Sequence, residues 1–299
     1  MITVLWRKTM NSNVLLNVMS VENEIQNLHT DFLGVPTYSE EGLGDFVAGI
    51  SGIFSNKLSF LSGFITGEKT KFPTEELSEY GRQLKLNAVK VDGIIRNKPV
   101  TIVLDTDVIV PMGFNSDLLY TAKELDKAIT LIKNTLFVEI DKVDTLISNI
   151  LTDEGYRLSS RPLVKNNNAK EINKTLNKIL KDIVGVGSTE EIVKLRTILP
   201  SVNKLKDVNN ILLAISSGVH LDTLNQIKLA SQRLREKCEE LHALSKNNDS
   251  FKIRKEILIS LVEDLEATAL MITNASTILT YYVQLVNCFL VMCEKINNG

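Results

Sequence analysis

The pattern of apolar and polar positions predicts long amphipathic helices in the second half of the chain. Apolar residues recur at alternating spacings of three and four from Leu118 to Ile150, and again from Leu258 to Cys293. This spacing is the period of an α-helix with one apolar face. Helices are therefore predicted over residues 116–154 and 251–296, and the first, with about 39 residues, would be about 58 Å long.

The last predicted helix carries a candidate interface. A sustained spacing of four and three residues keeps one side of a helix turned toward a long partner. The predicted partner is the 116–154 helix of the same chain or, alternatively, a second copy of the protein, and the pattern fits both. The large aliphatic residues of this seam are Leu258, Val262, Leu265, Ile272, Leu279, Val283, Val286 and Leu290.

Shorter elements fill the rest of the chain. Helices are predicted over residues 20–33, after the capping-box pair Thr37 and Glu40, and over 73–86, 169–184, 189–199, 202–217 and 221–245. Residues 89–110 are rich in valine and isoleucine and are interrupted by Gly93 and Pro99, which is typical of strands. The predicted fold is therefore mainly all-α, an elongated bundle of long coiled-coil-like helices. Its small β element near residues 89–110 would be a hairpin or a strand that pairs with another chain.

This pattern divides the chain into two regions. Residues 1–115 are predicted to hold short helices and the β element, and residues 116–299 the long-helix bundle. A further boundary is predicted at 156–168, where Pro162 and three consecutive asparagines indicate a loop. Polar residues interrupt the apolar positions of the first eighteen residues, so no export signal is apparent. The ordered protein is expected to begin near Ser20, an N-cap residue that Glu22 and Glu24 follow.

Composition narrows the range of functions. The chain has 299 residues, a formal net charge of -2 and a pI near 6.0, so it has no global attraction for nucleic acid. Only 6% of the residues are aromatic, which leaves leucine, isoleucine and valine to form the core. The three cysteines, Cys238, Cys288 and Cys293, are an odd number and indicate a reducing compartment rather than a disulfide framework.

One pair of carboxylates suggests metal chemistry. Asp105 and Asp107 follow the apolar run Val100–Leu104. Two hard oxygen ligands after a strand can hold a divalent cation against the diphosphate of a nucleotide sugar, as in a metal-dependent transferase. No alternating strands and helices surround the pair, however, and an Asp-Thr sequence is common in turns. A turn is therefore the preferred interpretation.

Two other motifs have structural explanations. The glycine-rich segment Gly185–Thr189 would suit a phosphate, but Glu190 and Glu191 follow it and would repel an anion, so a helix stop and a capped restart are predicted. Cys238 and His242 share one helical face, yet no second ligand pair accompanies them, so packing is predicted. The sequence therefore predicts no enzyme, no cofactor and no metal site.

The last helix also raises the question of a membrane. No charged residue occurs between Glu266 and Glu294, which is long enough to cross a bilayer. Threonine, asparagine and glutamine interrupt this stretch, and the seam already accounts for its apolar residues. A buried central helix is predicted, with a membrane-associated protein as the alternative.

Two stretches of sequence resemble a known group of proteins. They are Asp31-Phe32-Leu33-Gly34-Val35-Pro36-Thr37-Tyr38-Ser39-Glu40-Glu41, and Val110-Pro111-Met112-Gly113-Phe114 leading through Asp117-Leu118-Leu119-Tyr120. Both resemble virion structural or internal head proteins of large tailed bacteriophages. The resemblance implies a non-enzymatic protein of the phage head that is present in the host cytoplasm during assembly. Its implied partners are other virion proteins or copies of itself, as a homo-oligomer or as part of a larger assembly. It also implies trimming by a head-maturation protease, for which Ser39-Glu40-Glu41 would be a site.

Overall fold

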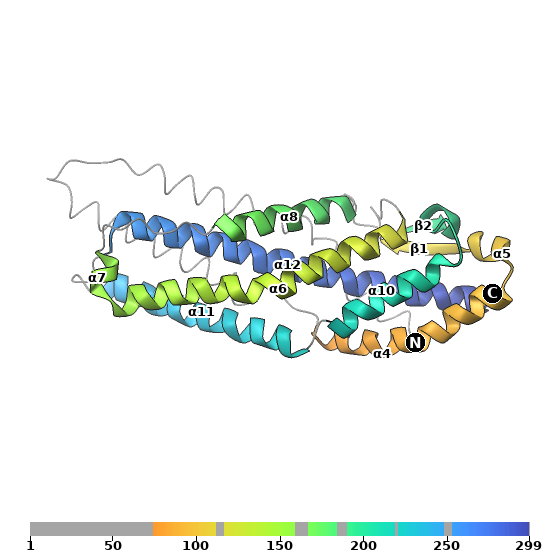
Figure 1. The fold of residues 1–299 in the computed structure, drawn as a ribbon, viewed down its shortest axis with the longest axis horizontal. Coiled ribbons are helices and arrows are strands. Elements are labelled where there is room, and N and C mark those ends of the chain that lie inside the picture. The colour runs from red at the N-terminus through yellow and green to blue at the C-terminus, as the bar shows by residue number, and fades with distance from the viewer. Residues whose placement is uncertain are drawn as a thin grey trace.

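The described residues form an elongated helical bundle. The computed structural model describes residues 74–111, 117–158, 167–183, 190–218, 221–247 and 253–298. These residues form nine helices and one sheet of two short strands, and the longer helices lie along a common long axis (Figure 1). The prediction of a mainly all-α fold is confirmed.

The two longest helices form the centre of the bundle. Helix α6 (Leu118–Thr152) begins where the Asp117 side chain accepts a hydrogen bond of 2.7 Å from the Leu119 backbone N–H. Helix α12 (Lys255–Asn298) has 44 residues and lies antiparallel to α6, with which it packs. Both helices match their predicted spans to within a few residues, and they pair within one chain.

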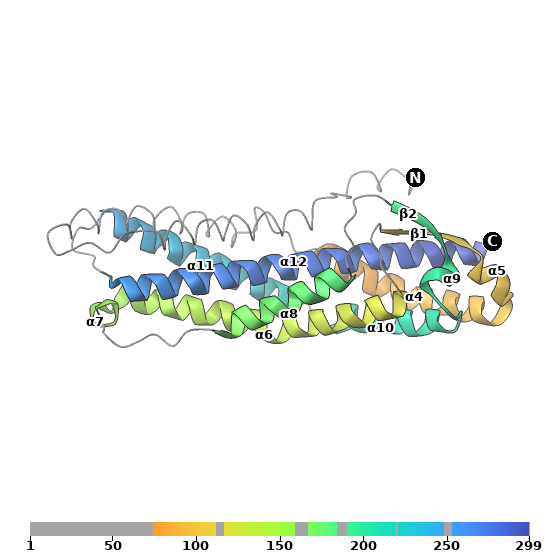
Figure 2. The same ribbon diagram turned by 90° about the horizontal axis from the view of Figure 1, so that it is seen from above.

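Shorter helices complete the two halves of the bundle (Figures 1 and 2). In one half, α4 (Thr74–Asn97) and α10 (Lys204–Gly218) pack on each other. Helix α4 also packs on α12, and α10 also packs on α6. In the other half, α11 (Leu221–Asn247) packs on α6, and α8 (Asn167–Ile183) packs on both α6 and α12. The short helix α7 (Glu154–Arg157) follows the end of α6.

The contact between α4 and α10 depends on a glycine. A Cβ atom placed on Gly81 would lie 3.3 Å from Cβ of Ser216. That distance is tighter than ordinary van der Waals contact, so a side chain at position 81 would require Ser216 to shift by a few tenths of an ångström. Gly81 therefore permits the close approach of α4 to α10.

The predicted hairpin at residues 89–110 is wrong. Residues 89–97 continue α4, Val100–Leu104 form helix α5, and only Asp107–Pro111 form a strand, β1. Its partner is β2 (Glu190–Lys194), antiparallel and far away in sequence, with Asp107 opposite Lys194. In α4 the buried residues follow the helical spacing rather than strand alternation, so burial overrides the strand propensity of valine and isoleucine. They include Leu84, Asn87, Val91 and Ile94.

A second correction concerns the predicted helix at 189–199. Its first half is the strand β2, and only Leu195–Ile198 form a helical turn, α9. Strands β1 and β2 together form a two-stranded ribbon. Val193 lies opposite Val108 in this ribbon and packs against the core, so this face of the ribbon covers the bundle. Tertiary packing therefore selects the strand, as it selects the helix in α4.

The described residues share one hydrophobic core. Buried residues of α4 and β1, which precede the predicted boundary at residue 115, belong to the same cluster as those of α6 and α12. No separate core divides the described residues at 115. The helices predicted over 20–33 and after Thr37, the first eighteen residues and most of the predicted 156–168 loop lie outside the described part of the chain.

Candidate interface along the last helix

The predicted seam residues of α12 lie in the core of the bundle. Val262, Leu265, Ile272, Leu279 and Val286 are each no more than 2% exposed. Val283 and Leu290 are partly buried and pack against the same cluster. The side chain of Leu258 lies outside the described part of the chain. In the described chain, α12 packs on α4, α6, α8 and β1.

Burial of α12 extends well beyond the seam. All residues from Met271 to Leu279 are buried and none is charged, and consecutive residues of a helix point in all directions around its axis. A helix that is buried on all sides is typical of a central position. The heptad pattern alone identifies only one side of α12, whereas the uncharged stretch between Glu266 and Glu294 indicates the full burial. Large side chains that the seam omits include Met271, Ile278, Tyr281, Tyr282, Leu285 and Phe289.

Buried asparagines connect α8 to α12. The Asn173 side chain donates a hydrogen bond of 2.7 Å to the Ala267 carbonyl, and its Oδ1 accepts one of 3.2 Å from Asn274 Nδ2. Both asparagines are less than 5% exposed. Because buried polar groups are costly when unpaired, this pair favours one axial position of α8 on α12.

A second buried pair connects α4 to α10. Asn87 Nδ2 donates to Asn209 Oδ1 at 3.1 Å, and Asn209 Nδ2 donates to the Leu84 carbonyl at 3.3 Å. The Tyr282 hydroxyl donates to the Leu212 carbonyl at 2.7 Å, which joins α12 to α10. Directional bonds therefore position the helices that van der Waals contacts hold together.

Ion pairs also cross between helices. Lys237 of α11 contacts the Asp144 carboxylate of α6 at 2.6 Å and also the Ser148 hydroxyl. Lys170 of α8 contacts Glu263 of α12 at 2.9 Å. Lys237 therefore connects α11 to two residues of α6 that lie one helical turn apart. The cluster has the chemistry of a structural contact.

The structure gives Asp105 and Asp107 cationic partners. Asp105 contacts Arg196 at 3.1 Å, and Asp107 contacts Lys194 at 2.8 Å across the ribbon. The hydrogen bond from Lys194 lowers the pKa of Asp107. Both carboxylates are about half exposed, so these are surface ion pairs that tie β1 to β2 and the turn that follows it. Among the described residues, no group of three or more His, Cys, Asp or Glu side chains could hold a metal ion.

The other two predicted motifs are placed differently. Gly185–Thr189 lies outside the described residues. Cys238 is fully buried, and burial raises the pKa of its thiol to about 12. His242 lies one turn later and is partly exposed. Cys238 therefore belongs to the contact of α11 with the core.

The three cysteines are expected to be unreactive in the folded protein. All are buried, and burial also raises the pKa of Cys293 to about 12. Since the thiolate is the reactive form, little of it exists at pH 8 while the bundle is folded. A chromogenic disulfide reagent should label no thiol rapidly in native protein and all three in urea. Rapid labelling of native protein at Cys238 or Cys293 would show that their surroundings open readily.

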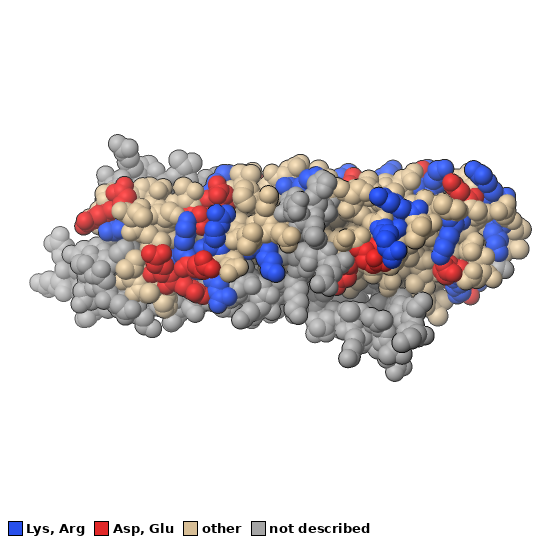
Figure 3. Space-filling view, turned by 90° about the horizontal axis from the view of Figure 1, so that it is seen from below, with Lys and Arg blue, Asp and Glu red and all other residues tan. Residues whose placement is uncertain are grey.

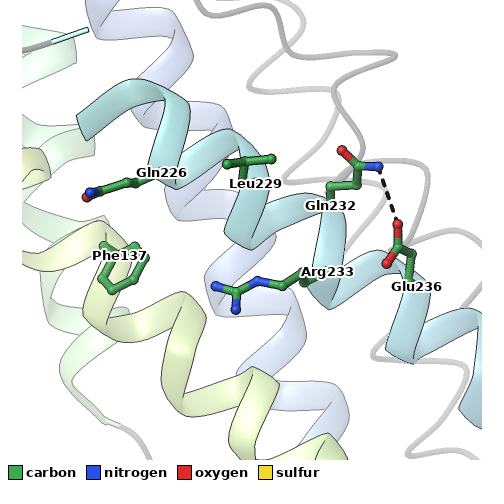
Figure 4. Close-up of a pocket in the computed structure, with 6 residues that line it drawn as sticks. All are labelled: Phe137, Gln226, Leu229, Gln232, Arg233 and Glu236. Carbon is green, nitrogen blue, oxygen red and sulfur yellow. Dashed lines mark hydrogen bonds between the residues drawn. The ribbon is translucent and has the colours of Figure 1, made fainter. Parts of the chain in front are cut away.

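An open pocket lies between α6 and α11 (Figure 4). Phe137 of α6 points toward α11, and the Arg233 side chain extends into the space between the two helices. On the outer side, Gln232 donates a hydrogen bond of 3.3 Å to Glu236. The six lining residues include no serine, cysteine or histidine, so this pocket suits contact with another surface better than covalent catalysis. They are Phe137, Gln226, Leu229, Gln232, Arg233 and Glu236.

Charged residues of both signs mix on the surface. On the face drawn in Figure 3, acidic and basic side chains lie next to one another along the bundle. Several form pairs within one helix, such as Arg82 with Glu79 and Arg235 with Glu239. Within the described residues of this face, charge is therefore not gathered into the single-sign patch that a nucleic-acid backbone requires.

Helix α12 also meets the length and composition of a membrane span. The segment Ile259–Asn298 contains a stretch of 18 residues whose mean hydropathy is 1.5, and 67% of that stretch is buried inside the bundle. The core helix of a soluble bundle passes the same test. Burial therefore accounts for the apolar character of α12 without a bilayer.

The described residues thus define an elongated all-α bundle built around a central helix. Searches of protein-family models, curated proteins and solved structures found no significant match to the chain.

Proposed function

We propose that this protein is a non-enzymatic structural or assembly component of a phage virion, associated with the head, that acts through helix packing. The observation that supports this most is the central helix α12, whose 44 residues are packed by helices along its length. A bundle with a continuous core along its long axis resists bending, because many buried contacts would have to break together. Such a rod suits a spacer or scaffold in a particle.

The surface of the bundle provides apolar contacts for partners. Val89, Leu229 and Ile192 are between 60% and 76% exposed. They lie on three different elements, α4, α11 and β2, so they are separate candidate contact points rather than one patch. The proposed partners are other virion proteins or further copies of this chain.

The phage assignment itself depends on the resemblance of two segments. The first, residues 31–41, lies outside the described residues. The second begins at the end of β1 with Val110 and Pro111, and resumes with Asp117 at the start of α6. It therefore forms the connection between the ribbon and the first long helix.

Mass spectrometry of purified particles tests the proposed function. The expected result is that peptides of this chain co-purify with virions at a constant ratio to the major capsid protein through successive gradients. The matched control is a cytoplasmic protein of similar abundance in the infected cell, which should be lost during purification. If the chain is lost together with that control, the proposed function is wrong.

A membrane-associated role is the second candidate, because α12 has the length and composition of a span. It requires that α12 leave the bundle, which would expose the buried asparagines and threonines of this helix to lipid at a high cost. Flotation with liposomes distinguishes the two candidates. The proposed structural role predicts that the folded protein stays at the bottom of the gradient.

A further inference from the structure

The strand β2 is the outer strand of the ribbon. In Figure 2, β1 lies between β2 and α12. Val108 is buried and Val193 partly buried, both on the face that packs on the core, and β1 contacts α12. Within the described residues the sheet has two strands, so no described strand pairs with the outer edge of β2.

The register fixes which backbone groups point outward from this edge. The Leu195 N–H donates to the Thr106 carbonyl at 3.0 Å, and these two residues continue the register in which Ile192 faces Ile109. Hydrogen-bonded and non-bonded pairs alternate in an antiparallel ladder. Ile192 therefore belongs to a non-bonded pair, and its backbone N–H and carbonyl point away from β1. The same holds for the backbone of residues 190 and 194.

We infer that the outer edge of β2 pairs with β2 of a second copy of this chain, antiparallel and centred on Ile192. The sequence Glu190-Glu191-Ile192-Val193-Lys194 is self-complementary in this register. A two-fold axis at Ile192 places position 190 of one copy opposite position 194 of the other. Position 190 then lies opposite Lys194, whose ammonium group also contacts Asp107 of its own chain, and the same contact is made twice, as a two-fold interface requires.

The exposed isoleucines fit the same arrangement. Ile109 and Ile192 lie directly opposite each other and are 38% and 70% exposed. Pairing of the two ribbons would produce a sheet of four strands with four isoleucines in one row across it, two from each copy. This row would cover apolar surface that a single ribbon leaves in water. The pairing also uses the outward Lys194 carbonyl as an acceptor. This carbonyl already accepts a hydrogen bond of 2.7 Å from Thr197 Oγ1, and its second lone pair stays available for the second copy.

This inference rests on the proposed assembly function and names one of its contacts. The two can fail separately, because the virion experiment concerns the presence of the chain in particles, whereas self-association is measured on the purified full chain. Sedimentation velocity over a wide range of protein concentrations is the test. The wild-type chain is expected to form a dimer as concentration rises.

Three variants locate the contact. Ile192→Pro removes the outward N–H without removing a bond between β1 and β2, and it should weaken dimerisation about tenfold or more, because the two-fold axis removes the bond twice. Glu190→Lys places like charges opposite each other and should also weaken it. Ile192→Val keeps the N–H and the branched side chain, and serves as the control that dimerises like the wild type. Circular dichroism verifies that each variant keeps its helices.

The outcomes separate clearly. Loss of the dimer in Ile192→Pro and in Glu190→Lys, with retention in Ile192→Val, supports the edge contact. A wild-type chain that stays monomeric at all concentrations overturns the inference. A dimer that Glu190→Lys leaves unchanged also overturns it, and this result applies even if the proline variant fails to fold.

Discussion

Val286→Asp is expected to unfold the bundle. Val286 is fully buried in α12, near the middle of the half that packs on α4. The substitution removes apolar contacts and places a carboxyl group where no water reaches it, which together should cost more than about 4 kcal/mol. Since a domain is stable by about 5 to 15 kcal/mol in total, the loss is a large part of what holds the fold together. Leu279→Asp, at a side chain 1% exposed, should have the same effect.

The matched control for this experiment lies on the same helix. Val291 is 37% exposed, so Val291→Asp makes the same chemical change where water can solvate the carboxylate. Thermal melting followed by circular dichroism should show the buried variants unfolded or melting far below the wild type. The control should melt close to it. Equal melting temperatures for Val286→Asp and Val291→Asp would show that α12 is not the core of the molecule.

The long helices were predictable because their apolar spacing persists over many turns. In α6 a single pattern runs from Leu118 to Ile150, and each of these positions that the pattern marks as apolar is in fact buried. The start of α6 is also marked locally, because Asp117 is an N-cap residue whose side chain accepts a hydrogen bond from the first turn of the helix. Long periodic segments leave little room for an alternative structure, which is why their bounds agree closely with the structure.

The ribbon could not be predicted from local sequence. β1 and β2 are far apart in the chain, and their pairing depends on a register that no local pattern contains. The valines and isoleucines of residues 89–103 favour strands, but Val91 and Ile94 lie on the buried side of α4, where packing decides. The same limit applies to Asp105 and Asp107. Their cationic partners, Lys194 and Arg196, come from β2 and α9. The sequence near the carboxylates therefore indicated a turn, with a metal site as the alternative, but not these ion pairs.

Predicted seam positions such as Leu279 and Val286 are buried in the bundle, but a heptad describes only one side of a helix. Helix α12 is surrounded, so side chains outside the seam are just as buried. The polar contacts were not predicted at all, because nothing near Asn173 in sequence indicates that it meets Asn274 of another helix.

The buried pair of Asn173 and Asn274 makes the final prediction. Asn173→Leu should destabilise the protein by about 1 to 3 kcal/mol, because the Asn274 side-chain amide then stays buried without its acceptor. Asn274→Leu should also destabilise it, since Asn173 Oδ1 loses the donor that reaches it at 3.2 Å. The double variant removes both polar groups from an apolar surrounding. We expect it to be more stable than either single variant and close to the wild type, as replacement of both partners by apolar groups can be nearly neutral.

Urea denaturation of the four proteins measures this as a double-mutant cycle. A coupling free energy of about 1 kcal/mol or more between the two positions is expected, since the residues are in direct contact. The control cycle pairs Asn173→Leu with Asn209→Leu, which lies in the other buried pair and shares no partner with Asn173. Effects at these two sites should add. If the Asn173 and Asn274 effects also add, the two side chains do not act as a pair, and the position of α8 on α12 is set by apolar packing alone.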